Sequence, residues 1–199
     1  IMPVAPADDA TITAQIKATL TFDLEKNWYQ AQGLDMQAKG MALDITDLAV
    51  KAGGDASAHL TAQEFSAKKF VFSASGVKGR DRFEAKLNVP ALSYAKDKFS
   101  GDSIALNAKL NGAPGDIEAA LSLPALDGNA RAFKVAALGL DVDLKQPEQT
   151  FKLKLTTPVT GSIEAQQFNL SDLKLALNAT GDKLPGKSIN SELKGGIRA

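Results

Sequence analysis

Hydrophobic and polar residues alternate strictly along the first part of the chain. Between Thr11 and Leu24 every even-numbered residue is apolar, and every odd-numbered residue is Thr, Gln, Lys or Asp. A period of two predicts a β-strand with one face against apolar material and the other in water. At about 3.4 Å per residue this strand is roughly 45 Å long, against the usual ~17–20 Å. That length favours an extended sheet over a compact sandwich.

The same alternation returns in six later runs, which are separated by turn-forming sequences. The runs cover residues 83–89, 104–110, 117–123, 138–144, 151–155 and 173–179. The intervening segments 111–116, 145–148 and 181–186 each contain turn-forming residues such as Gly, Pro, Asn or Asp. No stretch longer than about ten residues keeps a helical period of 3.6. We therefore predict an all-β fold with little helix.

Phenylalanines recur at almost constant spacing, which indicates an internal repeat. Phe65, Phe99, Phe133 and Phe168 are 34, 34 and 35 residues apart. Two further apolar columns follow five and seven residues behind them: Phe70, Ile104, Leu138 and Leu173, then Phe72, Leu106, Leu140 and Leu175. Repeats of this length bury their apolar faces by stacking on their neighbours. A repeated apolar stripe provides a surface and no reaction centre.

A second series of markers defines the repeat unit. Phe83, Ile117 and Phe151 open corresponding strands, and we expect Pro90, Pro124 and Pro158 to close them, because proline cannot donate to the strand ladder. Each unit then contains two strands. We expect a single β-repeat domain over residues 1–199, part of a longer protein, with units of roughly 49–82, 83–116, 117–150 and 151–185.

The five-residue offset between each repeat phenylalanine and the next apolar position is odd. In an unbroken strand the two side chains would lie on opposite faces, so we predict a bulge or a bend between them, supplied by segments such as 100–103 and 169–172. Equivalent residues then lie on alternate strands, roughly 10 Å apart. Wide sheets twist and curl. The predicted fold is an elongated, curled antiparallel sheet of long strands, with an apolar concave face.

Other repeat architectures fit this pattern less well. Tetratricopeptide repeats share the period of 34 residues, but their helical phase disagrees with the alternation by two. A parallel β-helix has shorter coils that are richer in Gly and Asn. An outer-membrane barrel needs two aromatic girdles, which one Trp and two Tyr do not supply. A closed β-sandwich, whose apolar stripes form a dry core, stays open as an alternative.

Composition and charge exclude several classes of function. Lys plus Arg and Asp plus Glu are equal at 23 each, so charge gives no reason to expect nucleic acid as a partner. Cysteine is absent, and His59 is the only histidine. Asp141 and Asp143 share one strand face without a calcium-binding loop, and we interpret them as part of a solvated face. No nucleophile or acid–base constellation can be assembled, so we expect no enzyme activity, catalytic residue, metal or cofactor.

Residues 161–181 (GSIEAQQFNLSDLKLALNATG) resemble the repeat of the AsmA family, and residues 60–72 (LTAQEFSAKKFVF) match the same pattern. The resemblance covers about residues 30–182. It implies a periplasmic segment of a Gram-negative envelope protein whose parent chain is anchored in the inner membrane. Family members form curled β-sheets with an apolar groove and are linked to outer-membrane assembly and phospholipid movement. The family has no catalytic motif to transfer.

The sequence thus leads to two hypotheses. In the first, the chain holds or conducts phospholipid acyl chains in an apolar β-groove, in support of outer-membrane assembly. In the second, it is a dry-cored scaffold that contacts other envelope proteins. The candidate groove residues are those of the repeated columns: Phe65, Phe70, Phe72, Phe83, Phe99, Ile104, Leu106, Ile117, Phe133, Leu138, Leu140, Phe151, Phe168, Leu173 and Leu175.

Overall fold

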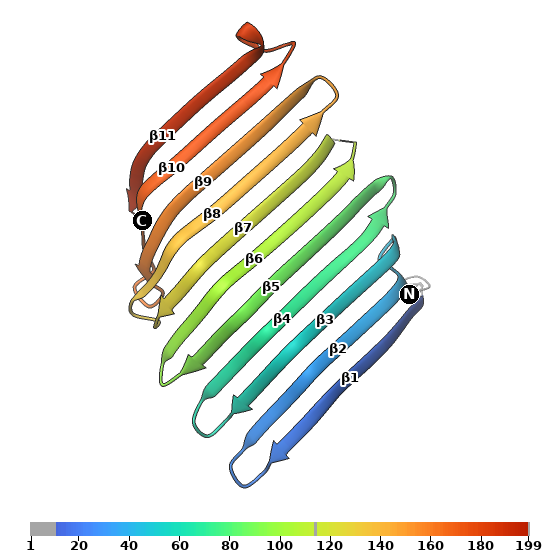
Figure 1. Ribbon diagram of the computed structural model, residues 1–199, viewed down its shortest axis with the longest axis vertical. Helices are drawn as coiled ribbons and strands as arrows, with labels where there is room; N and C mark the ends of the chain where they lie inside the picture. The colour runs from blue at the N-terminus through green and yellow to red at the C-terminus, as the bar shows by residue number, and fades with distance from the viewer. Residues whose placement is uncertain (1–10, 114, 199) are drawn as a thin grey trace, which may run out of the picture.

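The computed structural model describes residues 11–113 and 115–198, which form one antiparallel sheet (Figure 1). Its eleven strands lie side by side in chain order, and each pairs with its sequence neighbours. A short 3₁₀ turn, Pro185–Lys187, precedes the last strand. The strands are β1 (Thr11–Asp23), β2 (Trp28–Ala42), β3 (Ile45–His59), β4 (Glu64–Lys78), β5 (Asp81–Ala95), β6 (Lys98–Gly112), β7 (Gly115–Gly128), β8 (Phe133–Gln146), β9 (Gln149–Ser162), β10 (Gln167–Gly181) and β11 (Ser188–Arg198). The predicted all-β antiparallel fold is confirmed.

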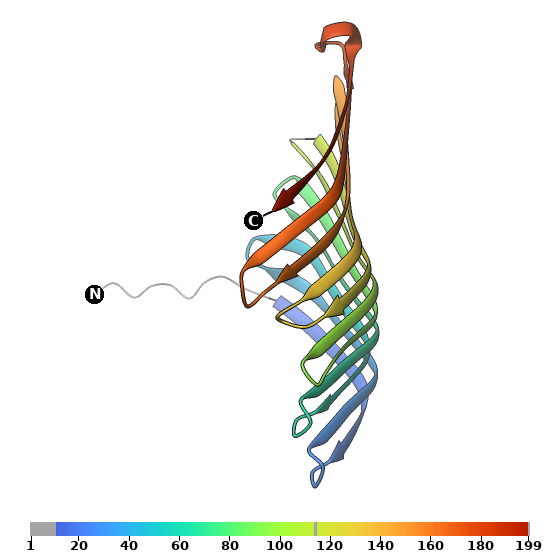
Figure 2. The same ribbon diagram turned by 90° about the vertical axis from the view of Figure 1, so that its left-hand side faces the viewer.

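The sheet is curled and open. Figure 2 shows the strands bowing together, so that the sheet forms a trough with one convex and one concave face. The accessible surface is 13719 Å². A compact globular protein of 20.9 kDa would expose only about 9,000 Å². The excess arises because the described residues provide no second layer to cover the sheet, and the closed sandwich is not seen.

Each 34-residue step corresponds to two strands. Phe65 lies in β4, Phe99 in β6, Phe133 in β8 and Phe168 in β10. The same steps place Phe83, Ile117 and Phe151 near the starts of β5, β7 and β9. The period of the sequence is therefore the period of a hairpin, and its apolar columns run across the sheet.

A line of irregular residues crosses the sheet near the middle of the strands, and we call it the bulge line. Lys69 in β4, Ser103 in β6 and Asp172 in β10 have φ of 52°, 51° and 50°, although none is glycine. Gly33 and Gly54 continue the line into β2 and β3, with φ of 60° and 135°. The predicted bulge in segment 169–172 is confirmed by register shifts of β10 against both of its neighbours. In segment 100–103 the irregularity is a bend at Ser103, and β6 keeps its register with both neighbours. At both places the irregularity lets the apolar residues on its two sides share one face.

The prolines lie on the bulge line, and the prediction that they close their strands is wrong. β5 continues past Pro90 to Ala95, β7 past Pro124 to Gly128, and β9 past Pro158 to Ser162. The ladder between β4 and β5 pairs Lys68 with Ala91 and Phe70 with Val89, which leaves Lys69 opposite Pro90. Because Lys69 has a left-handed conformation, the ladder is already interrupted opposite Pro90, and the missing proline donor is tolerated there.

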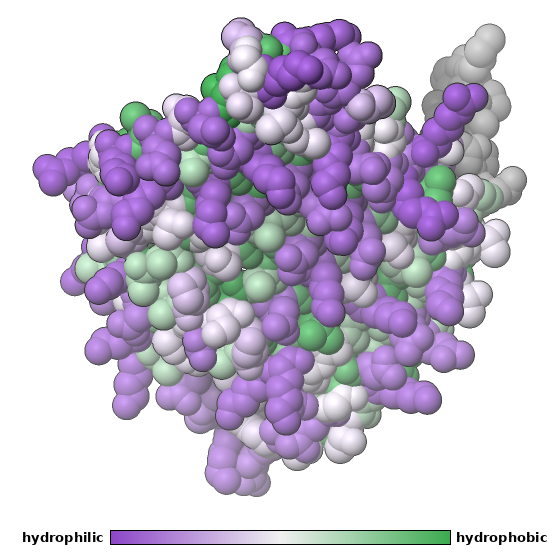
Figure 3. Space-filling view, turned by 45° about the horizontal axis from the view of Figure 1, so that its top comes forward, coloured by the Kyte–Doolittle hydropathy of each residue, from purple (hydrophilic) through white to green (hydrophobic). Residues whose placement is uncertain are grey.

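The two faces of the sheet differ sharply in polarity. The convex face is lined by hydrophilic side chains, with hydrophobic residues visible beneath them (Figure 3). Cross-strand ion pairs form on the polar face, such as Lys109–Glu118 at 3.2 Å. Asp141 and Asp143 pair there with Lys154 and Lys152, at 3.8 Å and 3.7 Å. Because successive side chains of a strand point to opposite faces, the apolar residues lie on the concave face.

Candidate functional site: an apolar trough

The repeat phenylalanines form a row across one end of the concave face, and we call it the aromatic row. Register connects its members strand by strand: Phe22–Tyr29 across β1 and β2, then Phe65–Tyr94–Phe99 across β4 to β6, then Gly128–Phe133–Gly161–Phe168 across β7 to β10. Tyr29 and Phe65 both lie opposite Ala58 of β3, which completes the row. The aromatic row therefore borders the trough over ten strands.

The rings in this row lie closer together than the strands that carry them. Alternate strands lie roughly 10 Å apart. The Phe133 centroid nevertheless lies 6.5 Å from that of Phe99 and 6.1 Å from that of Phe168. The intervening strands carry Gly128 and Gly161, so the rings meet over positions that have no side chain. Such edge and tilted contacts contribute about 0.5–1.5 kcal/mol each beyond area burial.

Three further rows of apolar residues lie on the other side of the bulge line. One row contains Phe72, Leu87, Leu106, Leu121, Leu140, Leu155 and Leu175 in continuous register from β4 to β10. Phe70, Ile104, Leu138 and Leu173 lie beside the bulges. Near the far end of the strands lie Phe83, Leu110, Ile117, Leu144, Phe151 and Ala179. The structure thus brings all fifteen candidate residues onto the same concave face.

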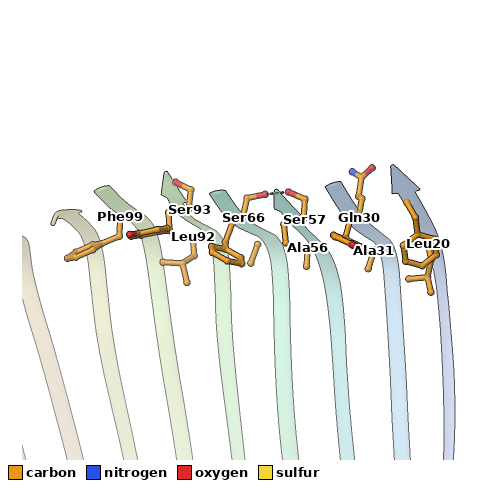
Figure 4. A pocket seen from close by; sticks show the side chains of 15 residues that line it. Leu20, Gln30, Ala31, Ala56, Ser57, Ser66, Leu92, Ser93 and Phe99 are labelled. Carbon is orange, nitrogen blue, oxygen red and sulfur yellow. Dashed lines mark hydrogen bonds between the residues drawn. The ribbon is translucent and has the colours of Figure 1, made fainter. Parts of the chain in front are cut away.

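An apolar depression lies between β1 and β6, beside the aromatic row. It has a volume of about 520 Å³, within the ~300–1,000 Å³ typical of ligand pockets. Figure 4 shows Ala31, Ala56 and Leu92 on one side of the strands, and Gln30, Ser57, Ser66 and Ser93 on the other. Phe22, Tyr29, Phe65, Tyr94 and Phe99 supply its aromatic wall. The surface is apolar but not fully enclosed.

Side chains along the trough remain accessible to a ligand. Phe65 is 47% exposed and Phe168 is 42% exposed, although both point to the concave face. The buried apolar residues Val89, Val135 and Leu173 all flank the bulge line, at the floor of the trough. The floor is therefore packed, while the rim offers apolar surface to the outside.

The floor also contains one fully buried polar side chain. Thr157 is fully buried, and its hydroxyl lies 2.9 Å from the carbonyl oxygen of Ser171 and 3.0 Å from that of Pro158. Its single proton satisfies a carbonyl group that the bulge removes from the regular ladder. In the described part of the chain, every buried side-chain nitrogen or oxygen has a partner.

Few polar groups lie at the rim of the trough. The Tyr94 hydroxyl donates a hydrogen bond to Asp97 at 3.1 Å, which raises the pKa of Tyr94 above its ordinary value. This phenol therefore stays neutral over the physiological range. No group of three or more His, Asp or Glu side chains in residues 11–113 and 115–198 is placed to hold a metal ion. His59 ends β3, where it lies opposite Trp28 and Glu64.

Several members of the site were missed by reasoning on the sequence. Tyr94, Gly128 and Gly161 belong to the aromatic row only through cross-strand register, which depends on turn length. A usable signal was present, because Tyr94 and Phe99 are equidistant from the two-residue turn at 96–97. No feature of the sequence indicated the role of Thr157, because that role depends on the bulge at Ser171.

The fold and the site together define an open, curled antiparallel β-sheet with an apolar trough. No helix among the described residues is long and apolar enough to cross a membrane. A scan of protein-family models found no match, and comparisons with curated proteins and with solved structures also found none.

Proposed function

We propose that this chain is a non-enzymatic periplasmic segment of an AsmA-like protein, which holds or conducts phospholipid acyl chains along its trough in support of outer-membrane assembly. The observation that carries the proposal is the continuous apolar concave face, uncovered by any described residue. The resemblance of residues 60–72 and 161–181 to the AsmA repeat supports the periplasmic setting and the phospholipid. The parent chain would be anchored in the inner membrane.

The dimensions of the trough suit acyl chains. From β1 to β10 there are nine strand spacings of about 4.8 Å, or roughly 43 Å in all. An acyl chain spans about half of a ~30 Å hydrocarbon core, or about 15 Å. The trough is thus long enough for more than one chain in sequence. That length favours conduction along the surface over storage of a single ligand.

The chemistry of the trough predicts loose and non-directional binding. Transfer of a methylene group from water to an apolar surface contributes about 0.8 kcal/mol. Affinity for single-chain lipids should therefore rise up to about fourfold for each added methylene. Headgroup identity should matter little, because the apolar depression presents few polar groups.

A pair of adjacent residues in β4 provides a matched test. Ala67 and Ser66 both border the apolar depression. Ala67 is two residues from Phe65 on the same strand and therefore shares its face. Ser66 is hydrogen-bonded to Ser57 on the opposite side (Figure 4). We expect Ala67→Glu to weaken binding of a fluorescent fatty acid at least tenfold, because the carboxylate must stay hydrated. Ser66→Glu should change it less than twofold.

Two outcomes count against the proposal. One is equal loss of binding in the two variants, or affinity that does not depend on chain length. The other is the absence of co-purifying phospholipid when the protein is produced in the periplasm of a Gram-negative host and its lipid extract is examined by mass spectrometry. The Ser66→Glu variant serves as the control in both experiments.

A further inference from the structure

The apolar row next to the aromatic row changes in side-chain size across the sheet. On β2, β3 and β4 it consists of Ala31, Ala56 and Ala67, which lie directly opposite one another. Leu20 on β1 and Leu92 on β5 lie at the two ends of this alanine row. From β7 to β10 the same row contains Leu126, Val135, Val159 and Leu170. Three adjacent small side chains therefore lower the concave surface between β1 and β5.

The alanine row is open to the outside. Ala56 is exposed although it lies in the middle of the row, whereas Val135, further along the same row, is only 5% exposed. The aromatic row also has an alanine on β3, Ala58, between Tyr29 and Phe65. These four alanines, Ala31, Ala56, Ala58 and Ala67, form the floor of the apolar depression of about 520 Å³ (Figure 4).

The small positions beyond β5 are instead covered by neighbouring side chains. A Cβ atom added at Gly101 on β6 would lie 3.0 Å from Cδ1 of Ile104 and 3.4 Å from Cδ1 of Leu92. In the aromatic row, Phe133 covers Gly161 in the same way. The open floor therefore ends where Leu92 and Ile104 converge over Gly101.

The dimensions of the open floor match one hydrocarbon chain. Four strand spacings of about 4.8 Å, or about 19 Å in all, separate Leu20 from Leu92. An acyl chain of about 15 Å, half of a ~30 Å hydrocarbon core, fits between these two leucines. The alanine row lies about 7 Å from the aromatic row. A chain with carbon contacts of about 3.5–4.0 Å on each side occupies that width.

We propose that the depression is a binding site for a single hydrocarbon chain, which lies across β2–β4 with one end against Leu92. We call it the chain site, and its floor is Ala31, Ala56, Ala58 and Ala67. The inference rests on the proposed function and deepens it, because the trough then holds an acyl chain at a fixed place and limits the length of chain that it accommodates. A chain must pass over Leu92 before it can continue along the trough towards β10.

A chain-length series tests the closed end of the site. Fatty acids from octanoic to eicosanoic acid compete with a fluorescent fatty acid for the purified protein. We expect affinity to rise by up to about fourfold for each methylene among the shorter acids. It should stop rising once the acid is longer than the about 19 Å between Leu20 and Leu92. Affinity that continues to rise up to the longest acid overturns the chain site but agrees with the proposed function, whereas affinity independent of length contradicts both.

Two leucines of the same row provide a matched pair of variants. Leu92→Ala removes the closed end, so affinity should continue to rise for acids that no longer gain in the parent chain. Leu126 lies directly opposite Gly101 on the far side of the closed end, so Leu126→Ala should keep the limit of the parent chain. A limit that is unchanged in Leu92→Ala, or that moves equally in the two variants, overturns the chain site.

Filling the floor tests the location of the site independently. Ala56→Leu places a larger side chain in the middle of the floor, and we expect at least tenfold weaker binding of hexadecanoic acid because the two groups clash. Ala119→Leu makes the same change on β7, in a different apolar row between Ala108 and Val142, and should weaken binding less than twofold. Equal effects of the two substitutions overturn the location. Circular dichroism of each variant verifies that the sheet is intact.

Discussion

The ring of Phe133 lies over Gly161, its direct cross-strand partner on β9. A Cβ atom added at Gly161 would lie 3.0 Å from Cε1 of Phe133 and 2.5 Å from the carbonyl oxygen of Gln167. The ring thus fills space that any other residue on β9 would occupy. This relationship allows Phe133 to contact Phe168 across an intervening strand, and it makes glycine a structural requirement of the aromatic row.

The first prediction concerns that glycine. We expect Gly161→Ala to lower the free energy of unfolding by about 1–3 kcal/mol, because the added methyl group overlaps a ring and a backbone oxygen. Gly195→Ala is the matched control, since a Cβ atom there meets no atom within 4 Å, and its effect should stay within about 0.5 kcal/mol. Urea denaturation measures both. Equal effects at the two sites would show that the Phe133–Gly161 contact is not specific.

The second prediction concerns the buried hydroxyl of Thr157. Thr157→Val keeps the shape of the side chain but leaves the carbonyl group of Ser171 without its donor. We expect a loss of about 1–3 kcal/mol in the free energy of unfolding. Thr150→Val is the control, because the Thr150 hydroxyl pairs with that of Thr180 on an exposed face, where water replaces the lost bond. A Thr157→Val variant as stable as the parent chain would contradict this role.

The third prediction concerns the backbone at the bulge line. Lys69 has φ of 52°, a conformation that glycine adopts freely and β-branched residues adopt poorly. We expect Lys69→Gly to be more stable than Lys69→Val by about 1–2 kcal/mol. At Val71, two residues further along β4, the order should reverse, because glycine weakens a regular strand. Thermal unfolding of the four chains gives the comparison, and the same order at both positions would refute the bulge.

The fourth prediction concerns pH and the turn after β1. Asp23 accepts a hydrogen bond from the backbone N–H of Lys26 at 3.0 Å, and this bond, aided by the Lys26 ammonium group, lowers the pKa of Asp23 below its ordinary value of 3.8. A carboxyl group whose pKa is lower in the folded state stabilises the fold fully above the ordinary pKa. That stabilisation is lost as the pH falls from 3.8 through the folded pKa.

Asp23→Asn should therefore be less stable than the parent chain at neutral pH, with a difference that shrinks as the pH falls below 3.8. Unfolding curves between about pH 5 and pH 2 measure the difference, and NMR titration of the carboxyl carbon gives the pKa directly. A carboxyl group that titrates at or above 3.8 would contradict the turn geometry.

Much of the fold follows from two patterns in the sequence, and the remainder depends on register. Alternation by two and the 34-residue period predict long strands in pairs, and the odd offset from Phe99 to Ile104 predicts a bulge or a bend. The place of Pro90 was mispredicted because a proline on the bulge line has the same local sequence as a proline at a strand end. The roles of Gly128 and Gly161 could not be predicted from the sequence. Each glycine lies opposite a phenylalanine (Phe133 and Phe168) across a turn, and the length of that turn decides the pairing. The apolar columns, in contrast, lie where the sequence period alone predicts.

Because every strand pairs only with its neighbours in the sequence, the cross-section of the trough and its length are independent properties. Removal of residues 83–116 would bring β4 beside β7 and shorten the trough by two strand spacings, about 10 Å, with the bulge line and the aromatic row still continuous. Duplication of the same residues would lengthen it equally. Loss or gain of whole hairpins in the gene would thus change the length of the trough in steps of about 10 Å without altering its cross-section.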